Sequence, residues 1–330
     1  MNALGSTSRV QSAADPVSRA PSRYSRDDVC LITIAYNSAQ ALRGLLQTCP
    51  RDVPVIVVDN ASEDDSARVA QANGADVIRL ARNVGFGAAC NVGAARARSR
   101  LLLFVNPDVR LGDGAIERLC ARFAALEDAG AVAPLLDHGD GRLWTKCANF
   151  IDIAHGCAPA SQDDAPTCLS GSVFLIERDT FAALGGFDPN LFLYYEEDDL
   201  FHRLCQKGLR LAIADDVVMA HAHGGSSGMS LATQWLKSYH TLKSKIYISK
   251  KYGLPFNAGK EVRRVVLRAL SGIVTLSPKR LVVAAARGRV LLSYAFGQLM
   301  FAPVKIEVLE PGTPRTGARP QGSSGRPACA

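Results

Sequence analysis

The sequence lacks several features that would assign the chain to a common class of protein. No uncharged apolar run reaches the roughly 18–20 residues that a membrane-spanning helix needs. The nine cysteines contain no C-x-x-C pair, and this odd, scattered set argues against a disulfide framework or a zinc site. It favours reduced thiols and a cytoplasmic location.

Phosphate-binding glycine motifs are also missing or incomplete. There is no G-x-x-x-x-G-K-[ST] loop, and Gly85-Phe86-Gly87 lacks the third glycine of a dinucleotide fingerprint because Cys90 stands there. Dinucleotide and P-loop binding are therefore weak interpretations. The two glycines indicate a tight turn or a close approach of the backbone to a ligand.

Acidic residues are almost absent from one long helical pattern. Between Leu231 and Met300 the only acid is Glu261, among many Lys and Arg residues that contribute to a net charge of +7. Such a strip needs an anionic partner. We expect its helices to lie on an anionic membrane surface, or to cover the main domain or a second copy in a homodimer. Because the strip has no recognised motif and few interleaved aromatics, no nucleic-acid partner is expected.

The first two thirds of the chain alternate apolar strands with helix-like spacing, which predicts an α/β fold with a mainly parallel sheet and helices on both faces. The first four expected strands cover residues 30–35, 53–58, 76–80 and 101–105. The domain prediction is a disordered leader over 1–28, a catalytic domain over 29–230, a basic helical extension over 231–305 and a disordered tail over 306–330.

Three predicted strands end in polar clusters. In open α/β sheets, ligands bind beyond the carboxyl ends of the strands, so these clusters should meet at one crevice. Each cluster alone is also compatible with an ordinary turn. The clusters are Tyr36-Asn37-Ser38, Asp59-Asn60-Ala61-Ser62 and Asn106-Pro107-Asp108.

Asp108 is a candidate ligand for Mg²⁺ or Mn²⁺. Both ions bind one or two carboxylates and complete their coordination shell with phosphate oxygens and water. His221 or His223 could add an imidazole, which favours Mn²⁺. A histidine in a Gly/Ser-rich loop can equally be structural or solvated.

Four consecutive carboxylates, Glu196, Glu197, Asp198 and Asp199, form the most unusual motif. They repel one another, and they precede an apolar helical face that predicts a helix from near Glu196 to Gly208. The helix dipole favours ionised carboxylates there, as a general base or a cation site requires. The alternative is an acidic helix start that only caps.

Together these motifs resemble the family 2 glycosyltransferases with the GT-A fold, and in particular their rhamnosyltransferase-like branch, over residues 30–227. The resemblance rests on Ala35-Tyr36-Asn37-Ser38, Val58-Asp59-Asn60-Ala61-Ser62, Asn83-Val84-Gly85-Phe86-Gly87 with Asn91 and Gly93, Asn106-Pro107-Asp108, Gly185-Gly186-Phe187-Asp188, the acidic cluster with Tyr195 and Leu200, and His221-x-x-Gly224-x-Ser226. It implies that Asp59 reads a pyrimidine base, that Asp108 holds the metal and that His221 approaches the diphosphate.

The resemblance also implies the remaining site residues. The nucleotide-sugar side would comprise Ala35, Tyr36, Asn37, Asp59, Asn60, Ser62, Asn83, Gly85, Gly87, Asn91, Asn106 and Asp108. The acceptor side would comprise Gly171, Gly186, Phe187 and Asp188. Members of the family usually carry Glu-Asp where this chain has Glu196-Glu197. Glu197 is therefore the preferred base, Asp199 the second choice, and Asp198 a third possibility.

The expected reaction is transfer of a sugar from a nucleoside diphosphate to an acceptor hydroxyl, with inversion implied by the family. The resemblance favours dTDP-rhamnose as donor, with UDP-sugars next, and a role in cell-wall or polysaccharide synthesis. The acceptor is a glycan, a lipid-linked glycan or a small metabolite. The alternatives are a sugar-phosphate nucleotidyltransferase, which needs a basic Gly-rich loop that the first strand lacks, and a non-catalytic binding protein of the same fold.

Overall fold

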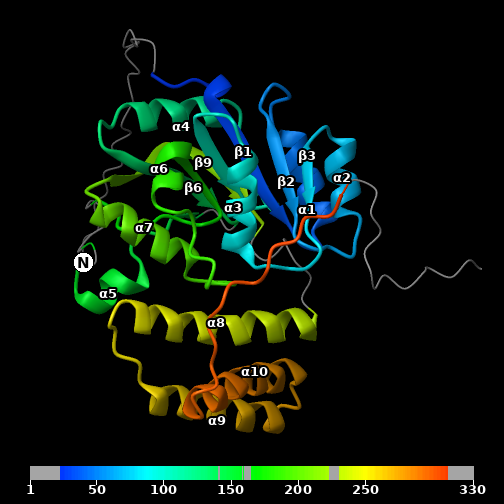
Figure 1. Ribbon diagram of the computed structural model, residues 1–330, viewed down its shortest axis with the longest axis vertical. Coiled ribbons are helices and arrows are strands. Elements are labelled where there is room, and N and C mark those ends of the chain that lie inside the picture. The colour runs from blue at the N-terminus through cyan, green and yellow to red at the C-terminus, as the bar shows by residue number, and fades with distance from the viewer. Residues whose placement is uncertain (1–22, 140–141, 158, 160–164, 223–229, 311–330) are drawn as a thin grey trace, which may run out of the picture.

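The computed structural model describes residues 23–139, 142–157, 159, 165–222 and 230–310. Within them a mixed β-sheet lies between layers of helices, and three further helices form a bundle at one end of the molecule (Figure 1). The predicted α/β fold with a C-terminal helical extension is therefore confirmed.

The first half of the sheet is parallel. Its strands follow the order β3-β2-β1-β4 and match the predicted ones closely, namely β1 (Val29–Ala35), β2 (Val55–Asp59), β3 (Asp76–Arg79) and β4 (Leu101–Val105). Because the register aligns Ala35 with Asp59, β1 and β2 end side by side. The polar clusters that follow them therefore lie at the same edge of the sheet.

The second half of the sheet is mixed. There β8 (Val173–Glu177) pairs antiparallel with β4 and β6 (Ala129–Asp137), and β6 pairs parallel with β9 (Arg210–His221). Two short strands complete it, β5 (Val109–Arg110) on β9 and β7 (Leu143–Trp144) on β6. The pairing of β6 with β9 contains a register shift, because Pro134 pairs with Ala214 whereas the next residue, Leu135, pairs with Val218.

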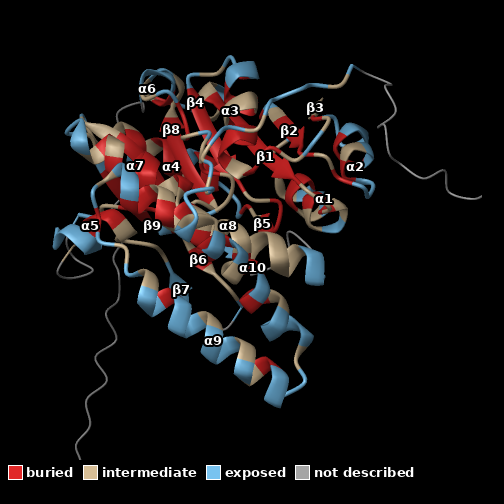
Figure 2. Cartoon of the chain, turned by 60° about the horizontal axis from the view of Figure 1, so that its bottom comes forward, coloured by how far each residue is buried: buried red, intermediate tan, exposed pale blue. Residues whose placement is uncertain are grey.

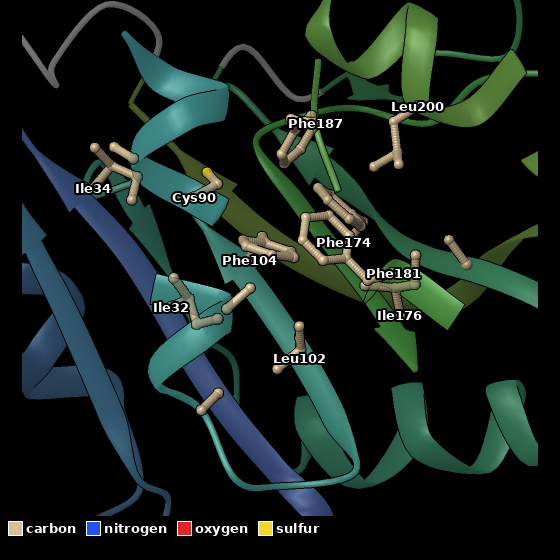
Figure 3. Close-up of a cluster of buried hydrophobic side chains, with 14 of the residues drawn as sticks. Ile32, Ile34, Cys90, Leu102, Phe104, Phe174, Ile176, Phe181, Phe187 and Leu200 are labelled. Carbon is tan, nitrogen blue, oxygen red and sulfur yellow. The ribbon is translucent and has the colours of Figure 1, made fainter. Parts of the chain in front are cut away.

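Alternate strand residues enter two cores, one on each face of the sheet. On β4, Leu102 and Phe104 face one cluster, whereas Leu101, Leu103 and Val105 face the other. Burial on both faces explains why these strands read as continuous apolar runs. In the first cluster Phe104 stacks on Phe174, with ring centroids 5.0 Å apart (Figure 3). The flanking helices are α1 (Ala39–Thr48), α2 (Ser66–Ala72), α3 (Phe86–Arg96), α4 (Ala115–Ala124) and α6 (Arg178–Ala183).

The ends of the ordered chain extend further than the sequence predicted. Tyr24, assigned to the disordered leader, is buried, and its hydroxyl donates to Glu177 over 3.0 Å; a turn at Arg26–Asp28 follows. At the other end, Leu309 N–H donates to Arg79 O over 2.8 Å and Val308 bridges to Leu80. These residues bond to the sheet, so the predicted disorder there is wrong. Residues 1–22 and 311–330 lie outside the described part.

The basic extension is a three-helix bundle of α8 (Leu231–Lys251), α9 (Ala258–Val274) and α10 (Pro278–Ala295). Its single acid, Glu261, is buried and accepts hydrogen bonds from Lys245, Arg264 and Arg287 at 2.8, 2.8 and 3.1 Å. These bonds outweigh burial and lower the pKa of Glu261. One carboxylate thereby ties the three helices together. In the described residues, no helix combines the length and apolar character needed to cross a bilayer.

Candidate active site

A cavity of about 420 Å³ opens at the carboxyl ends of β1, β2 and β4. Tyr36, Asn60 and Asn106, which follow these three strands, line it, so each predicted strand-end cluster contributes at least one residue. Its lining also includes Glu196 and Glu197. The acidic cluster and the strand ends, far apart in the sequence, therefore share one cavity.

The polar residues after β1 and β2 hold the cavity rim in shape. Asn60 donates to Asn83 Oδ1 over 3.0 Å and to the Gly85 carbonyl over 3.1 Å, and its Oδ1 accepts from Val84 N–H at 2.9 Å. Asn60 thereby ties the end of β2 to the loop before α3. Because the Asn60 amide both donates to and accepts from this loop, we infer that Asn60 holds the rim of the cavity in place.

Asp59 and its neighbours form a second set of internal contacts. Asp59 is buried, and its Oδ1 accepts from Ser62 N–H over 2.9 Å. The Ser62 hydroxyl in turn accepts from Asn37 N–H over 3.1 Å. Neither these residues nor Ala35, which is buried at the end of β1, are among those lining the cavity, whereas Tyr36 is.

The glycine motif serves packing within the protein. Gly85 has φ +92°, and a side chain there would collide with the backbone carbonyl of Phe192. A Cβ on Gly87 would lie 2.9 Å from Cβ of Phe187. Asn91 exchanges two hydrogen bonds with the backbone of Phe187, at 2.8 and 2.9 Å. Of the three predicted nucleotide-sugar residues here, only Gly85 lines the cavity; Gly87 and Asn91 press α3 against the chain before α7.

The acidic cluster occupies the first turn of α7 (Glu196–Gln206), as predicted. Tyr194 and Tyr195 both have left-handed backbones, with φ of 69° and 71°, and they turn the chain into the helix. Successive helical residues point about 100° apart. The four carboxylates therefore enter four different environments.

Glu196 and Glu197 face the cavity. The Glu196 residue is only 2% exposed, whereas the Glu197 side chain is 26% exposed. Burial, with a contribution from the charge of Glu197, raises the pKa of Glu196 well above its usual range. Burial therefore disfavours the charged form of Glu196 and makes it a poorer candidate for the base than Glu197. Glu197 is the cavity-lining carboxylate of α7 that solvent and substrate reach.

Asp198 and Asp199 point elsewhere. Asp198 accepts from Phe150 N–H over 2.6 Å, at the start of α5 (Phe150–His155), and burial raises its pKa. Asp199, with a side chain 0% exposed, bonds to Arg203 at 2.7 Å and to Tyr252 at 2.7 Å, with Lys251 also in contact. Asp199 does not line the cavity, and its contacts tie α7 to α8, which argues against its role as an alternative base.

Lys146 is a functional candidate that sequence reasoning missed. It lines the cavity, and its ammonium lies 2.7 Å from Asp198 and 3.2 Å from Glu197. Burial works against the charge, but Glu197 and then Cys168 and Asp198 raise the pKa of Lys146, so it remains a cation. It fixes the Glu197 carboxylate from one side. No local pattern marks a lone lysine some fifty residues from its partners.

The predicted acceptor-side residues separate into two groups. Gly171 lines the cavity, and a Cβ there would lie 3.4 Å from Cβ of Glu197. Gly186 and Phe187 lie outside it, Phe187 being fully buried in the core. Asp188 bonds to Lys251 and to the Tyr247 hydroxyl at 2.7 and 2.8 Å, and these bonds lower its pKa despite burial. Their contacts assign Gly186, Phe187 and Asp188 to packing and ion pairing, and only Gly171 remains at the site.

Asp108 and His221 meet where β5 pairs with β9. Asp108 Oδ1 lies 3.4 Å from His221 Nε2 and accepts no hydrogen bond within the described residues, although it is buried. His138, which sequence reasoning missed, stacks near His221 with ring centroids 5.2 Å apart. His223 lies outside the described residues, among which no group of three or more His, Cys, Asp or Glu could enclose a metal.

This donor set fits a divalent cation that is shared with a ligand. An orphaned buried carboxylate oxygen beside an imidazole supplies an oxygen and a nitrogen donor, and phosphate oxygens and water would complete the shell of Mg²⁺ or Mn²⁺. Pro107, the residue before Asp108, lines the cavity, so the pair lies next to it.

The C-terminal bundle also reaches the cavity, which the sequence did not indicate. Thr233, Leu236 and Lys237, from the first turns of α8, line it beside Trp144 of β7. They are positioned there because α8 packs on the chain before α7, where Phe192 stacks on His240 with ring centroids 4.0 Å apart. The boundary predicted at 230 thus passes through the wall of the site.

The fold and this site define a glycosyltransferase of the GT-A class. Among solved structures, the chain is similar to a mannosyltransferase from Pyrobaculum calidifontis in complex with GDP-Man and Mn²⁺, with a TM-score of 0.51 and 20% identity over 86% of this chain and 79% of that one. A likeness at this identity supports the fold.

The sequence comparisons agree with this class. Residues 30–178 match the model of glycosyl transferase family 2. The chain is similar to the N-acetylglucosaminyl-diphospho-decaprenol L-rhamnosyltransferase of Mycobacterium tuberculosis, with 25% identity over 65% of this chain and 82% of that protein. It is also similar to the dTDP-rhamnosyl transferase RfbF of Shigella flexneri, with 22% identity over 61% and 72%. The resemblance to rhamnosyltransferase-like members of family 2 is confirmed.

Proposed function

We propose that this glycosyltransferase moves rhamnose from a dTDP donor to a hydroxyl of a glycan or lipid-linked glycan, with inversion and with Glu197 as the base. The observation that carries the mechanism is the position of Glu197, a partly exposed carboxylate in the wall of the cavity that opens at the ends of β1, β2 and β4. The rhamnosyltransferase relatives support the donor.

The reaction is a single displacement. The acceptor hydroxyl attacks the anomeric carbon, the bond to the diphosphate oxygen breaks, and the hydroxyl proton passes to the Glu197 carboxylate. A base is needed because the hydroxyl has a pKa far above neutrality. Burial of Glu196 disfavours its charged form, and Asp198 and Asp199 are held by Phe150 and Arg203 outside the lining of the cavity.

Lys146 and the Asp108–His221 pair support the two ends of this displacement. Lys146 holds Glu197 in one orientation through its 3.2 Å ion pair. Asp108 and His221 would hold a Mg²⁺ or Mn²⁺ ion that stabilises the negative charge on the departing diphosphate. Asn60 and Asn83 keep the loop before α3 in place as the donor enters.

The acceptor is proposed from the C-terminal bundle. Because α8 forms part of the cavity wall, an acceptor bound in the cavity would lie near Leu236 and Lys237. A lipid-linked glycan at the inner face of a membrane suits an apolar and a cationic side chain at this entrance, and it would give the protein a role in polysaccharide or cell-wall synthesis. The same helices could instead join two copies of the chain.

A donor panel tests the proposal. Purified protein would be given dTDP-rhamnose, UDP-glucose or GDP-mannose, each with Mg²⁺ or Mn²⁺, and release of the nucleoside diphosphate measured. We expect dTDP-rhamnose to be consumed fastest, and Glu197→Gln to bind dTDP-rhamnose with little turnover. Preference for another donor would refute the rhamnosyl assignment, and failure to bind any nucleotide sugar would refute the transferase mechanism.

A further inference from the structure

One face of α9 is apolar and faces solvent. Val262, Val266, Leu270 and Ile273 recur every three or four residues, so they form a row along the helix. Leu270 and Ile273 are 55% and 60% exposed. Figure 2 shows α9 as an edge of the molecule that is exposed over most of its length. Single exposed apolar residues are ordinary, but a continuous row of them marks an interaction surface.

The opposite face of α9 is already used by the bundle. Glu261 is buried there by its cations from α8 and α10, and Val265 packs against the core that includes Leu242. A Cβ on Gly272 would lie 2.8 Å from Leu281 Cδ2, so α9 and α10 cross closely. The apolar row therefore takes no part in the hydrophobic packing of the described residues.

Exposed cations lie on the same helix: Arg263 flanks the apolar row, whereas Arg268 lies on the opposite side of α9. Arg263 and Arg268 are exposed, and neither makes an ion pair within the described residues. Lys260, Lys279 and Arg280 are exposed nearby. Because Glu261 is the only acid between residues 231 and 300 and is buried, no exposed carboxylate of the bundle offsets this charge.

We propose that α9 docks on an anionic lipid surface, with its apolar row at the acyl boundary and its cations among the headgroup phosphates. Apolar side chains beside arginines are the features that hold a helix in this interface. A second copy of the chain is a poorer partner, since joining two of these faces would bring together two positively charged bundles whose only acid, Glu261, is buried. A purely polyanionic partner would leave the apolar row exposed.

Docking would hold the bundle at the membrane. The same bundle contributes Leu236 and Lys237 of α8 to the cavity wall, so docking would keep the site close to a surface that carries a lipid-linked acceptor. This consequence rests on the proposed function. The docking itself does not, because it is measured without turnover.

The test is sedimentation of the full-length protein with phosphatidylcholine vesicles that contain or lack phosphatidylglycerol. Two double variants are compared with wild type. Leu270→Glu with Ile273→Glu disrupts the apolar row, and Arg263→Gln with Arg268→Gln removes two cations of α9. The matched control is Arg68→Gln with Arg122→Gln, on α2 and α4. All three pairs lower the net charge by the same amount at exposed positions, and α4 lies at the end of the molecule opposite α9 (Figure 1).

Wild type and control should sediment with the anionic vesicles and be released by salt. Each arginine removed from α9 should weaken binding about fivefold, the ratio that corresponds to about 1 kcal/mol per cation. The apolar variant should fail to bind while its donor hydrolysis stays normal. Equal binding by all variants, or none by the wild type, would overturn the proposal. A wild-type dimer that Leu270→Glu with Ile273→Glu dissociates, with no vesicle binding, would assign the face to a second copy.

Discussion

Replacing Glu197 by Gln should separate the chemistry of the site from its stability. The substitution keeps the shape of the side chain but removes the proton acceptor, so turnover should fall by about 10²–10⁴. The fold should hardly change. The Glu197 side chain is partly exposed, and Lys146 keeps its shorter contact with Asp198 at 2.7 Å, so the loss of stability should be about 1 kcal/mol or less.

Asp199→Asn is the matched comparison and should behave in the opposite way. Asp199 is fully buried and bonds to Arg203, Lys251 and Tyr252. Removing its charge leaves Arg203 without a carboxylate partner, whereas Lys251 keeps its ion pair with Asp188, so the free energy of unfolding should fall by about 3 kcal/mol. Activity per folded molecule should fall far less than in Glu197→Gln.

The assay pairs donor turnover with urea unfolding on both variants. Turnover is measured at a temperature where each variant is folded, and dTDP binding is measured separately. The reasoning would be refuted if Glu197→Gln turned over normally while Asp199→Asn was stable and inactive. That result would make Asp199 the base and would require the first turn of α7 to rotate in solution.

Three further predictions concern the same region. Because burial raises the pKa of Glu196, the folded wild type keeps a proton that the unfolded chain loses above about pH 4.5, and the wild type is destabilised as pH rises above that value. Glu196→Gln does not titrate, so its free energy of unfolding relative to wild type should increase over the same range. Urea unfolding across pH measures this difference. Asp108→Asn should weaken Mn²⁺-dependent dTDP binding by at least about tenfold, as EDTA should in the wild type, and calorimetry that shows equal binding would remove Asp108 from the metal site. Gly85→Ala should cost several kcal/mol because of its φ and the Phe192 carbonyl, whereas Gly74→Ala, also left-handed (φ +79°) but with open space, should cost only about 1 kcal/mol; equal costs would contradict the clash.

The first four strands were predictable because each is a short apolar run that ends in turn residues. Leu101–Val105 is buried on both faces, and nothing in its pattern competes with a central strand. The register shift beside Pro134 was not predictable, because it depends on how β6 pairs with β9. Likewise, Tyr24 and Leu309 carry no local signal that they bond to the sheet.

The site was predictable as a set of motifs but not as a geometry. The acidic cluster could be read as catalytic, yet the direction of each carboxylate depends on where α7 begins, which the left-handed Tyr194 and Tyr195 determine. Asn91 and Gly87 belong to the family's pattern but contact Phe187 instead of the cavity. Lys146 and the first turns of α8 reach the cavity wall only through tertiary packing, which no local sequence pattern indicates.

Helix α8 limits how freely the C-terminal part of this enzyme can be exchanged. At its start it supplies cavity residues such as Lys237, and at its end Lys251 and Tyr252 hold Asp199 and with it the catalytic helix. A chimaera that replaced the segment after residue 230 to acquire a new acceptor would therefore lose part of the scaffold of the old active site. Acceptor preference and catalytic integrity are coupled here, so changes in specificity should be sought through substitutions within α8 and not through exchange of the whole bundle.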